Sequence, residues 1–339
     1  MHNFFSDTQT KPSRAMLETV FSAEVGDEQR GEDKTVKELE ARVADLLGKE
    51  AAVFMPSGTM CNEIAINLHC RPGDDVICAH QSHIIVAEGG GPAALSGVMI
   101  HALATEDGTF DADAVRAAVN PKSRYAPNSR LVSFEQTVNL AGGVVWPLEK
   151  LAAAAEVAKA HGLATHMDGA RLMNAAVASG RPAKHHAAQM DSVWIDFTKG
   201  LGTPFGAVLA GSADFIERAW SVKQRWGGAM RQSGTMAAMC LYALEHNVDR
   251  LADDHALAAS IAERLTGMAG IKLVIQPATN ILIFDLSEDG PDADQVARDL
   301  AKHNVQVSVF GEWRLRAVTH LDVGPADGDA FVEAIGAVL

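Results

Sequence analysis

Short apolar runs alternate with longer stretches of helical period along most of this chain. Residues 36–47 (VKELEARVADLL) predict an amphipathic helix, and further helices are predicted at 62–68 and 148–161. Strands are predicted at the apolar runs 52–55, 75–78, 130–135, 164–167, 192–197 and 205–209. This alternation favours an α/β fold with a mainly parallel sheet covered by helices on both faces. Ligands of such sheets bind at the carboxyl ends of the strands.

The pattern changes near residue 247, and the length of 339 residues suits two domains. We expect a large domain over 1–246 and a smaller C-terminal α/β domain over 247–339. The predicted helices of the smaller domain are 251–265, 292–303 and 327–338, and its predicted strands are 272–275, 280–284 and 305–309. The segment 1–20 lacks a clear core pattern, so we expect it to contact either domain or a neighbouring subunit.

The charge balance disfavours two classes of partner. The chain carries 43 acidic and 29 basic side chains, a net charge of -14, which suits neither nucleic acid nor an anionic membrane surface. No apolar run is long enough to span a membrane. The four cysteines show no metal-binding spacing, so no metal site is expected. With no export signal evident, free thiols in the cytoplasm are expected.

Two polar motifs follow predicted strands and carry candidate binding groups. Ser57-Gly58-Thr59 precedes a helix, whose first N–H groups bind phosphate readily, although a turn with a helix cap has the same sequence. Asp168 ends an apolar strand, where a carboxylate needs a partner. It either caps the next helix or holds the protonated nitrogen of a heteroaromatic cofactor. Arg171 offers a planar fork of donors for a carboxylate.

A lysine and a histidine follow two further strands. Lys199 comes directly after 192–197, where desolvation favours covalent chemistry with a carbonyl group; a solvated loop lysine is the alternative. His83 follows 75–78 by a short loop and suits stacking on a flat cofactor or proton transfer, although a purely structural histidine is common. A reactive lysine, a strand-end acid and a phosphate site are together what pyridoxal phosphate requires.

The whole chain resembles the threonine aldolase family, which are pyridoxal-phosphate lyases of the aspartate aminotransferase-like fold (fold type I). The matching motifs begin at Phe5-Ser6-Asp7-Thr8 and end at 318–323 (VTHLDV). Between them lie, in order, EVGD (24–27), GEDKTV (31–36), GKEAA (48–52), PSGT (56–59), GGPAA (90–94), DGAR (168–171), KGLGTP (199–204) and MRQSG (230–234).

The resemblance implies a role for each matching residue. Lys199 looks like the Schiff-base lysine, and Asp168 like the partner of the pyridine nitrogen. Gly58 and Thr59 match the phosphate loop, and His83 matches the histidine stacked on the cofactor ring. Ser6, Arg171 and Arg316 match groups that hold the substrate carboxylate, with Arg171 also counted among the cofactor contacts. Arg231 matches an arginine that reaches the phosphate of a neighbouring subunit, which implies a dimer or tetramer with shared sites.

Three positions depart from the family pattern. Val138 stands where many members have a histidine near the β-hydroxyl of the substrate. Valine cannot accept a proton, so another group or a water must be the base; the apolar side chain is also expected to admit a larger β-substituent. Arg30 and Gln224 replace a tyrosine and a lysine that are common in the family. These departures bear on the substrate more than on the reaction.

We therefore predict retro-aldol cleavage of L-β-hydroxy-α-amino acids (threonine, allo-threonine or phenylserine) to glycine and an aldehyde. His83 is the first choice for the base that takes the β-hydroxyl proton. Another reaction of the same cofactor, such as β-elimination or transamination, and a non-catalytic protein of this fold are the alternatives. The expected partners are an amino-acid substrate and further copies of the chain.

Overall fold

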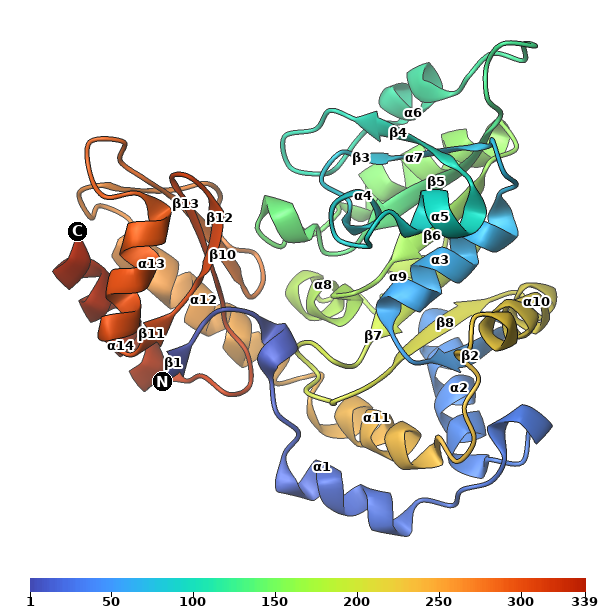
Figure 1. Cartoon of the computed structure of the whole chain (residues 1–339), viewed down its shortest axis with the longest axis horizontal. Coiled ribbons are helices and arrows are strands. Elements are labelled where there is room, and N and C mark those ends of the chain that lie inside the picture. The colour runs from blue at the N-terminus through green and yellow to red at the C-terminus, as the bar shows by residue number, and fades with distance from the viewer.

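The computed structural model describes residues 1–339, and its strands form three sheets (Figure 1). The largest is a seven-stranded sheet, with neighbouring strands in the order β2 (Ala51–Met55), β8 (Ala207–Gly211), β7 (Ser192–Asp196), β6 (Ala164–Asp168), β5 (Ser129–Glu135), β3 (Asp75–Ala79) and β4 (Met99–Leu103). Six of these strands lie within a few residues of their predicted positions. The sequence analysis missed β4, which is half-exposed at one edge of the sheet.

The strand directions bring four chain segments to one edge of this sheet. Neighbouring strands from β4 to β7 are parallel, whereas β8 is antiparallel to both β7 and β2. Two antiparallel steps make β2 run in the same direction as β7. The carboxyl ends of β2, β3, β6 and β7 therefore share one edge, and the four polar motifs follow those ends, as the sequence analysis expected.

Helices cover both faces of the sheet. Those around it are α1 (Arg14–Glu18), α2 (Lys34–Leu47), α3 (Gly58–His69), α4 (His83–Val86), α5 (Gly91–Ser96), α6 (Ala112–Ala118), α7 (Leu148–Ala160), α8 (Leu172–Ser179), α9 (Ala183–Ala187), α10 (Ala213–Arg225) and α11 (Gly234–His246). Along β2, Phe54 faces one core cluster with α2, α7 and α11, whereas Val53 and Met55 face another with α3 and α10. No helix combines the length and apolar character that crossing a membrane requires.

Helix α2 illustrates how the sequence sets an element. Val36, Leu39, Val43 and Leu47 are buried and lie three or four residues apart, so they form one apolar face. The helix begins two residues before the predicted start, because the Asp33 side chain accepts a hydrogen bond from Val36 N and caps it. It ends at Gly48, whose left-handed φ of 63° closes the last turn.

A separate four-stranded antiparallel sheet forms the C-terminal unit, in the order β12 (Ser308–Gly311), β13 (Arg314–Val318), β10 (Ile281–Leu286) and β9 (Ile271–Leu273). It is covered by α12 (Leu251–Leu265), α13 (Ala293–Lys302) and α14 (Pro325–Val338). The single strand predicted at 305–309 is divided into β11 (Val305–Gln306) and β12. The sequence analysis missed β13. The turn between α11 and α12 is where it placed the domain boundary.

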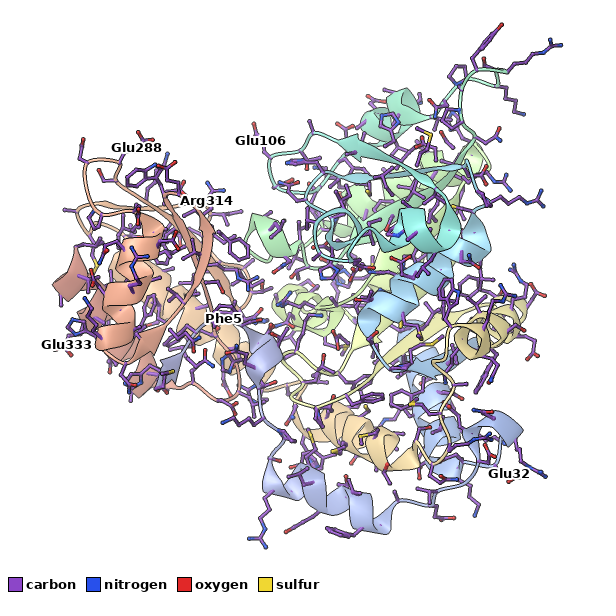
Figure 2. All side chains as sticks on the ribbon, viewed as in Figure 1. Phe5, Glu32, Glu106, Glu288, Arg314 and Glu333 are labelled. Atoms are coloured by element: carbon purple, nitrogen blue, oxygen red, sulfur yellow. The ribbon has the colours of Figure 1, made fainter.

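The N-terminal segment contacts the C-terminal unit. Strand β1 (His2–Asn3) pairs in parallel with β11, and Phe4 is buried with its ring 5.0 Å from that of Phe331. Figure 1 accordingly shows both chain ends at this unit. Phe5 is labelled in Figure 2 where the segment passes toward the large sheet. The sequence had left open which part of the fold these residues contact.

Candidate active site

A cavity of about 330 Å³ lies at the edge of the large sheet where the four motifs meet. Its lining residues come from both ends of the chain: Ser6, Thr8, Ser57, Gly58, Thr59, His83, Glu135, Thr137, Asn139, Asp168, Ala170, Arg171, Trp194, Asp196, Thr198, Lys199 and Arg316. The structure therefore brings together eight of the predicted site residues: Ser6, Gly58, Thr59, His83, Asp168, Arg171, Lys199 and Arg316.

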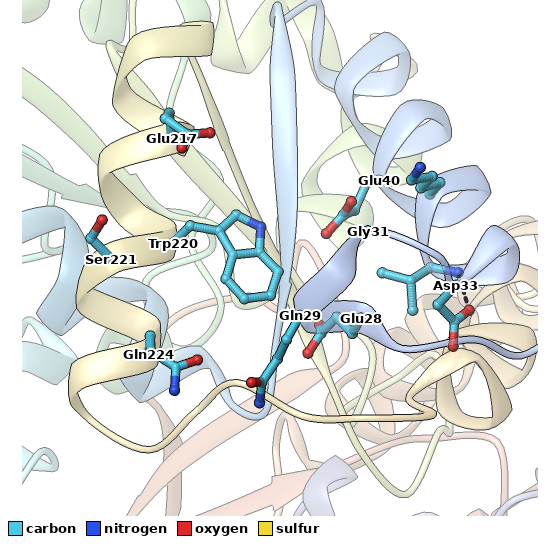
Figure 3. A pocket seen from close by; sticks show the side chains of 11 residues that line it. Glu28, Gln29, Gly31, Asp33, Glu40, Glu217, Trp220, Ser221 and Gln224 are labelled. Carbon is cyan, nitrogen blue, oxygen red and sulfur yellow. Dashed lines mark hydrogen bonds between the residues drawn. The ribbon is translucent and has the colours of Figure 1, made fainter.

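A larger cavity of about 680 Å³ lies between α2 and α10 (Figure 3). None of the predicted site residues lines it. The buried Lys223 beside it is already paired with Glu28, and its Nζ lies 4.3 Å from the centroid of the Trp220 ring. Because this cation is neutralised and none of the predicted site residues lines the space, the candidate active site is the smaller cavity.

The turn after β2 forms one end of the cavity. Ser57 caps α3, with its Oγ accepting a hydrogen bond from Met60 N at 3.2 Å. Gly58 and Thr59, in the first turn, have N–H groups without a partner inside the helix. The same motif can therefore cap the helix and still offer free N–H groups to an anion. Gly58 is also required by packing, because a Cβ there would collide with the Trp194 ring.

Asp168 lies deep in the cavity at the end of β6 and is 3% exposed. Its carboxylate accepts hydrogen bonds from Asn62 Nδ2 at 2.8 Å and from Ala170 N at 3.0 Å. Burial raises its pKa, against the opposing effects of His83 and Asn62. Helix α8 starts at Leu172 with no side-chain cap, so Asp168 does not serve as its helix cap.

Lys199 follows β7, and its Nζ pairs with the buried carboxylate of Asp196. Asp196 also accepts hydrogen bonds from Thr198 N and Oγ1, both at 2.8 Å. The lysine side chain is 17% exposed, so it is not a solvated loop lysine. The sequence analysis missed Asp196, although its place three residues before the lysine was a usable signal.

His83 begins α4 and contacts two buried carboxylates. Its Nδ1 lies 2.7 Å from Glu88 Oε1, and its backbone N donates to Glu135 Oε2 at 2.7 Å. Burial alone would lower the pKa of His83, but Glu88, Asp168 and Glu135 outweigh that effect and raise it. Burial, together with the charge of Asp168, raises the pKa of Glu135 to about 7.

The two arginines that line the cavity, Arg171 and Arg316, differ in whether an acidic side chain of the protein neutralises their charge. Arg171 forms a two-pronged pair with Asp7, with Nε 2.8 Å from Oδ2 and Nη2 2.6 Å from Oδ1. Arg316 meets only neutral oxygens, from Asn139 Oδ1 at 2.9 Å and Phe5 O at 3.3 Å, and its buried Nε has no partner. Burial, with the charge of Arg171, lowers the pKa of Arg316 to about 10. Arg316 therefore holds the uncompensated positive charge of the site.

Two predicted site residues lie outside the cavity. Val138 is 1% exposed, its side chain contacts Gly108, and it is not among the cavity-lining residues, so its predicted substrate contact stays a prediction. Valine is buried there because the apolar side chain joins the large core cluster. Arg231 pairs with Asp27 and is 61% exposed. Its predicted contact with a neighbouring subunit stays a prediction.

Comparison with known proteins places the chain in a family. The model of the family described as beta-eliminating lyase matches residues 3–289. The chain belongs to the beta-eliminating lyase family. Two relatives are the low-specificity L-threonine aldolase 1 of Arabidopsis thaliana, 39% identical over 95% of this chain and 92% of the relative, and the low specificity L-threonine aldolase of Escherichia coli (strain K12), 41% identical over 94% and 93%.

A solved structure confirms the fold of this member of the family. The threonine aldolase of Leishmania major superposes with a TM-score of 0.85, covering 99% of this chain and 98% of that one at 22% identity. The predicted aspartate aminotransferase-like fold, with a large and mainly parallel sheet, is thus confirmed, and so is the resemblance to the threonine aldolases.

Proposed function

We propose that this chain cleaves L-β-hydroxy-α-amino acids between Cα and Cβ, releasing glycine and an aldehyde. The observation that carries the proposal is the cavity itself, which joins a buried lysine, a strand-end carboxylate, a helix N-terminus and an uncompensated arginine. Relatives that match over nearly the whole length are named threonine aldolases. The chain is therefore a carbon–carbon lyase, with threonine and allo-threonine as its expected substrates.

The donor groups of the cavity fit pyridoxal 5'-phosphate. Lys199 supplies the amine, Asp168 a buried carboxylate for the pyridine nitrogen, and the first turn of α3 with Thr59 a place for the phosphate. When bound, the cofactor supplies an electron sink for the negative charge that develops at Cα.

The arginines orient the substrate. Arg316 lines the cavity and binds the α-carboxylate, because no protein anion neutralises it. Arg171 contributes mainly Nη1, since Asp7 holds its other two nitrogens. Ser6 adds a hydroxyl whose oxygen is held by Thr8 N at 3.2 Å. A fixed carboxylate sets the angle of the Cα–Cβ bond, on which cleavage depends.

His83 accepts the proton of the β-hydroxyl, directly or through a water. It is the only histidine that lines the cavity, and Val138 cannot take this role. Asp196 is the nearest partner for the Lys199 ammonium, so it holds that side chain in the cavity. Asn139 joins the two arginines through Oδ1 and keeps the entrance rigid.

Product analysis of the cofactor-loaded protein tests this function. L-Threonine, L-allo-threonine and L-phenylserine are each supplied, and the products are identified by mass. Equal amounts of glycine and aldehyde support the aldol reaction. A keto acid with ammonia would instead indicate β-elimination, the reaction after which the matched family is named. An amino group transferred to the cofactor would indicate transamination.

The chain is further proposed to act in the cytoplasm as a dimer or tetramer with shared sites. Supporting an oligomer, Arg231 lies outside its own chain's cavity, and Phe21 is 91% exposed on the N-terminal segment. All four cysteines are buried and free, which suits a reducing compartment. Sedimentation velocity and cell fractionation test these two proposals.

A further inference from the structure

Two neighbouring buried glutamates, Glu88 beside His83 and Glu63 next to Glu88, have too few hydrogen-bond partners. Both carboxylate oxygens of Glu63, and Oε2 of Glu88, have no hydrogen-bond partner although they are shielded from solvent. Glu63 is on α3 and is 2% exposed, while Glu88, on the loop between α4 and α5, is 9% exposed. Two neighbouring anions in such a place would be very unfavourable. A single proton shared between the two carboxylates leaves only one negative charge and so avoids this cost.

The bonds around Asn62 favour Glu88 as the ionised member of the pair, because accepted hydrogen bonds stabilise a carboxylate and the Glu63 oxygens accept none. Trp194 Nε1, which can only donate, lies 2.6 Å from Asn62 Oδ1, and His166 Nε2 donates to the same oxygen at 3.1 Å. The amide nitrogen of Asn62 must then donate its hydrogens to Asp168 Oδ2 at 2.8 Å and Glu88 Oε1 at 2.7 Å. Glu88 Oε1 is therefore an acceptor.

The same oxygen fixes the tautomer of His83. Glu88 Oε1 lies 2.7 Å from His83 Nδ1, and since an ionised Glu88 has no hydrogen to donate, Nδ1 must carry the hydrogen. In the neutral imidazole the second nitrogen, Nε2, then has a free lone pair. This is the protonation state that a base needs.

We propose that Glu63 carries the shared proton and donates it to Glu88, and that Glu88 is thereby an ionised positioning residue that orients His83 with Nε2 free to take the substrate proton. The proposal rests on the proposed function, in which His83 is the base. Neither Glu63 nor Glu88 lines the cavity. Their effect reaches the reaction through His83 and, by way of Asn62, through Asp168.

Other charged groups also face this cluster. His83 is faced by Glu88 from the loop after α4, by Glu135 from β5 and by Asp168 from β6. Lys199 acts on Asp168 from the turn after β7. Burial, and then the charge of Glu88, raises the pKa of Glu63 to about 8, in agreement with a protonated Glu63 at neutral pH.

The first test replaces Glu88 and measures both activity and titration in the loaded protein. E88Q removes the anion beside His83, so the pKa of that imidazole should fall by about one unit. It is measured by NMR of the histidine rings, with the signal assigned by its loss in H83N. The kcat/KM for L-threonine should fall about 10- to 100-fold, the loss typical of a partner that orients a functional histidine. The acid limb of the profile of kcat/KM against pH should move to lower pH.

The matched control is E40Q. Glu40 is also a largely buried glutamate, and burial raises its pKa to about 7, but it accepts a hydrogen bond from Phe54 N far from the cavity lining. E40Q should keep kcat/KM and the His83 titration as in the natural chain. An unchanged His83 pKa in E88Q would overturn the proposal even if the chain cleaves threonine. Absence of cleavage in every variant would instead overturn the proposed function, while the NMR shift still tests the positioning role.

A second variant locates the proton and does not depend on E88Q folding. In E63Q the glutamine amide N–H replaces the carboxylic-acid proton as the donor to Glu88, and this amide does not titrate. Because Glu88 keeps its charge, kcat/KM should fall much less than in E88Q. Folded Glu63 keeps its proton up to about pH 8, whereas the unfolded chain releases it near the ordinary value of 4.5. Stability of the natural chain is thus lost as pH rises through this window. The Tm of E63Q relative to the natural chain should therefore rise between pH 5 and pH 8, and a constant difference would contradict a proton on Glu63.

Discussion

The guanidinium of Arg171 forms a two-pronged ion pair with the carboxylate of Asp7, and both side chains are almost fully buried. This pair leaves Arg316 as the cation that no protein anion neutralises. The two arginines, which the family resemblance treats alike, therefore have different tasks. Arg171 ties the N-terminal segment to the cavity through Asp7, and we propose that Arg316 binds the substrate carboxylate.

Replacing Arg316 should weaken substrate binding specifically. In R316Q the KM for L-threonine should rise at least about 10-fold, because a desolvated charge contact is worth more than about 1.4 kcal/mol. Cofactor affinity, measured by fluorescence titration, should change little, since Arg316 is not among the proposed cofactor contacts. R316K is the matched control and should recover part of the loss, because it restores charge without the fork. An unchanged KM in R316Q would refute this assignment.

Replacing Asp7 should destabilise the fold. D7N leaves Arg171 buried without an anion, so the free energy of unfolding should fall by about 3–5 kcal/mol. Urea unfolding measures the loss. D27N breaks the exposed pair with Arg231 and should cost less than about 1 kcal/mol. Arg171 holds the pKa of Asp7 well below its usual range, against the effect of burial. The contribution of the pair should therefore persist down to strongly acidic pH, and equal losses in both variants would contradict this account.

Replacing Asp196 should change how the loaded protein titrates. Its carboxylate is the ion-pair partner of Lys199 Nζ in the cavity. In D196N the pH at which the near-ultraviolet absorbance of the bound cofactor changes should therefore move to lower values, with a shift on the order of one unit. Absorbance is read across a pH series, independently of turnover. T198V, which keeps the carboxylate, is the control. A titration that does not move would mean that Asp196 does not act on the lysine.

Mixed oligomers test whether sites are shared. K199A and R231A should each be inactive or nearly so, because one lacks the reactive amine and the other the proposed contact with a neighbouring phosphate. If the arginine serves the neighbouring chain, co-refolding the two variants should restore part of the activity. Mixing K199A with R316Q gives the control, since both changes affect the same chain's cavity. No recovery with R231A would indicate that each chain forms its site alone.

The sequence predicted most of the sheet because its strands are continuous apolar runs buried on both faces. It missed β4 and β13. Strand β4 is half-exposed at the sheet edge, and β13 alternates charged and apolar residues, as in Arg314 and Arg316. A local sequence pattern also could not predict which strands pair when they lie far apart along the chain. Strand β1 owes its existence to β11, which lies 300 residues away along the chain.

The cavity residues with direct chemical roles were predictable, but the residues that support them were not. Lys199, Asp168 and His83 each follow a strand and stand in a recognisable motif. Asn62, Glu63, Glu88 and Asp196 look like ordinary polar residues of a helix, loop or strand end, and only their burial reveals their contacts. Val138 shows the converse. Its place in a motif suggested a cavity contact, whereas the chain turns its side chain into the core.

The most direct test of the central claim measures acetaldehyde and glycine released from L-threonine by the cofactor-loaded protein and by K199A. Our account predicts equal amounts of the two products from the natural chain, and a loss of at least about 1,000-fold in K199A, since the lysine supplies the covalent step. Glycine and acetaldehyde at the same rate from K199A, or no cleavage by the loaded natural chain, would contradict it.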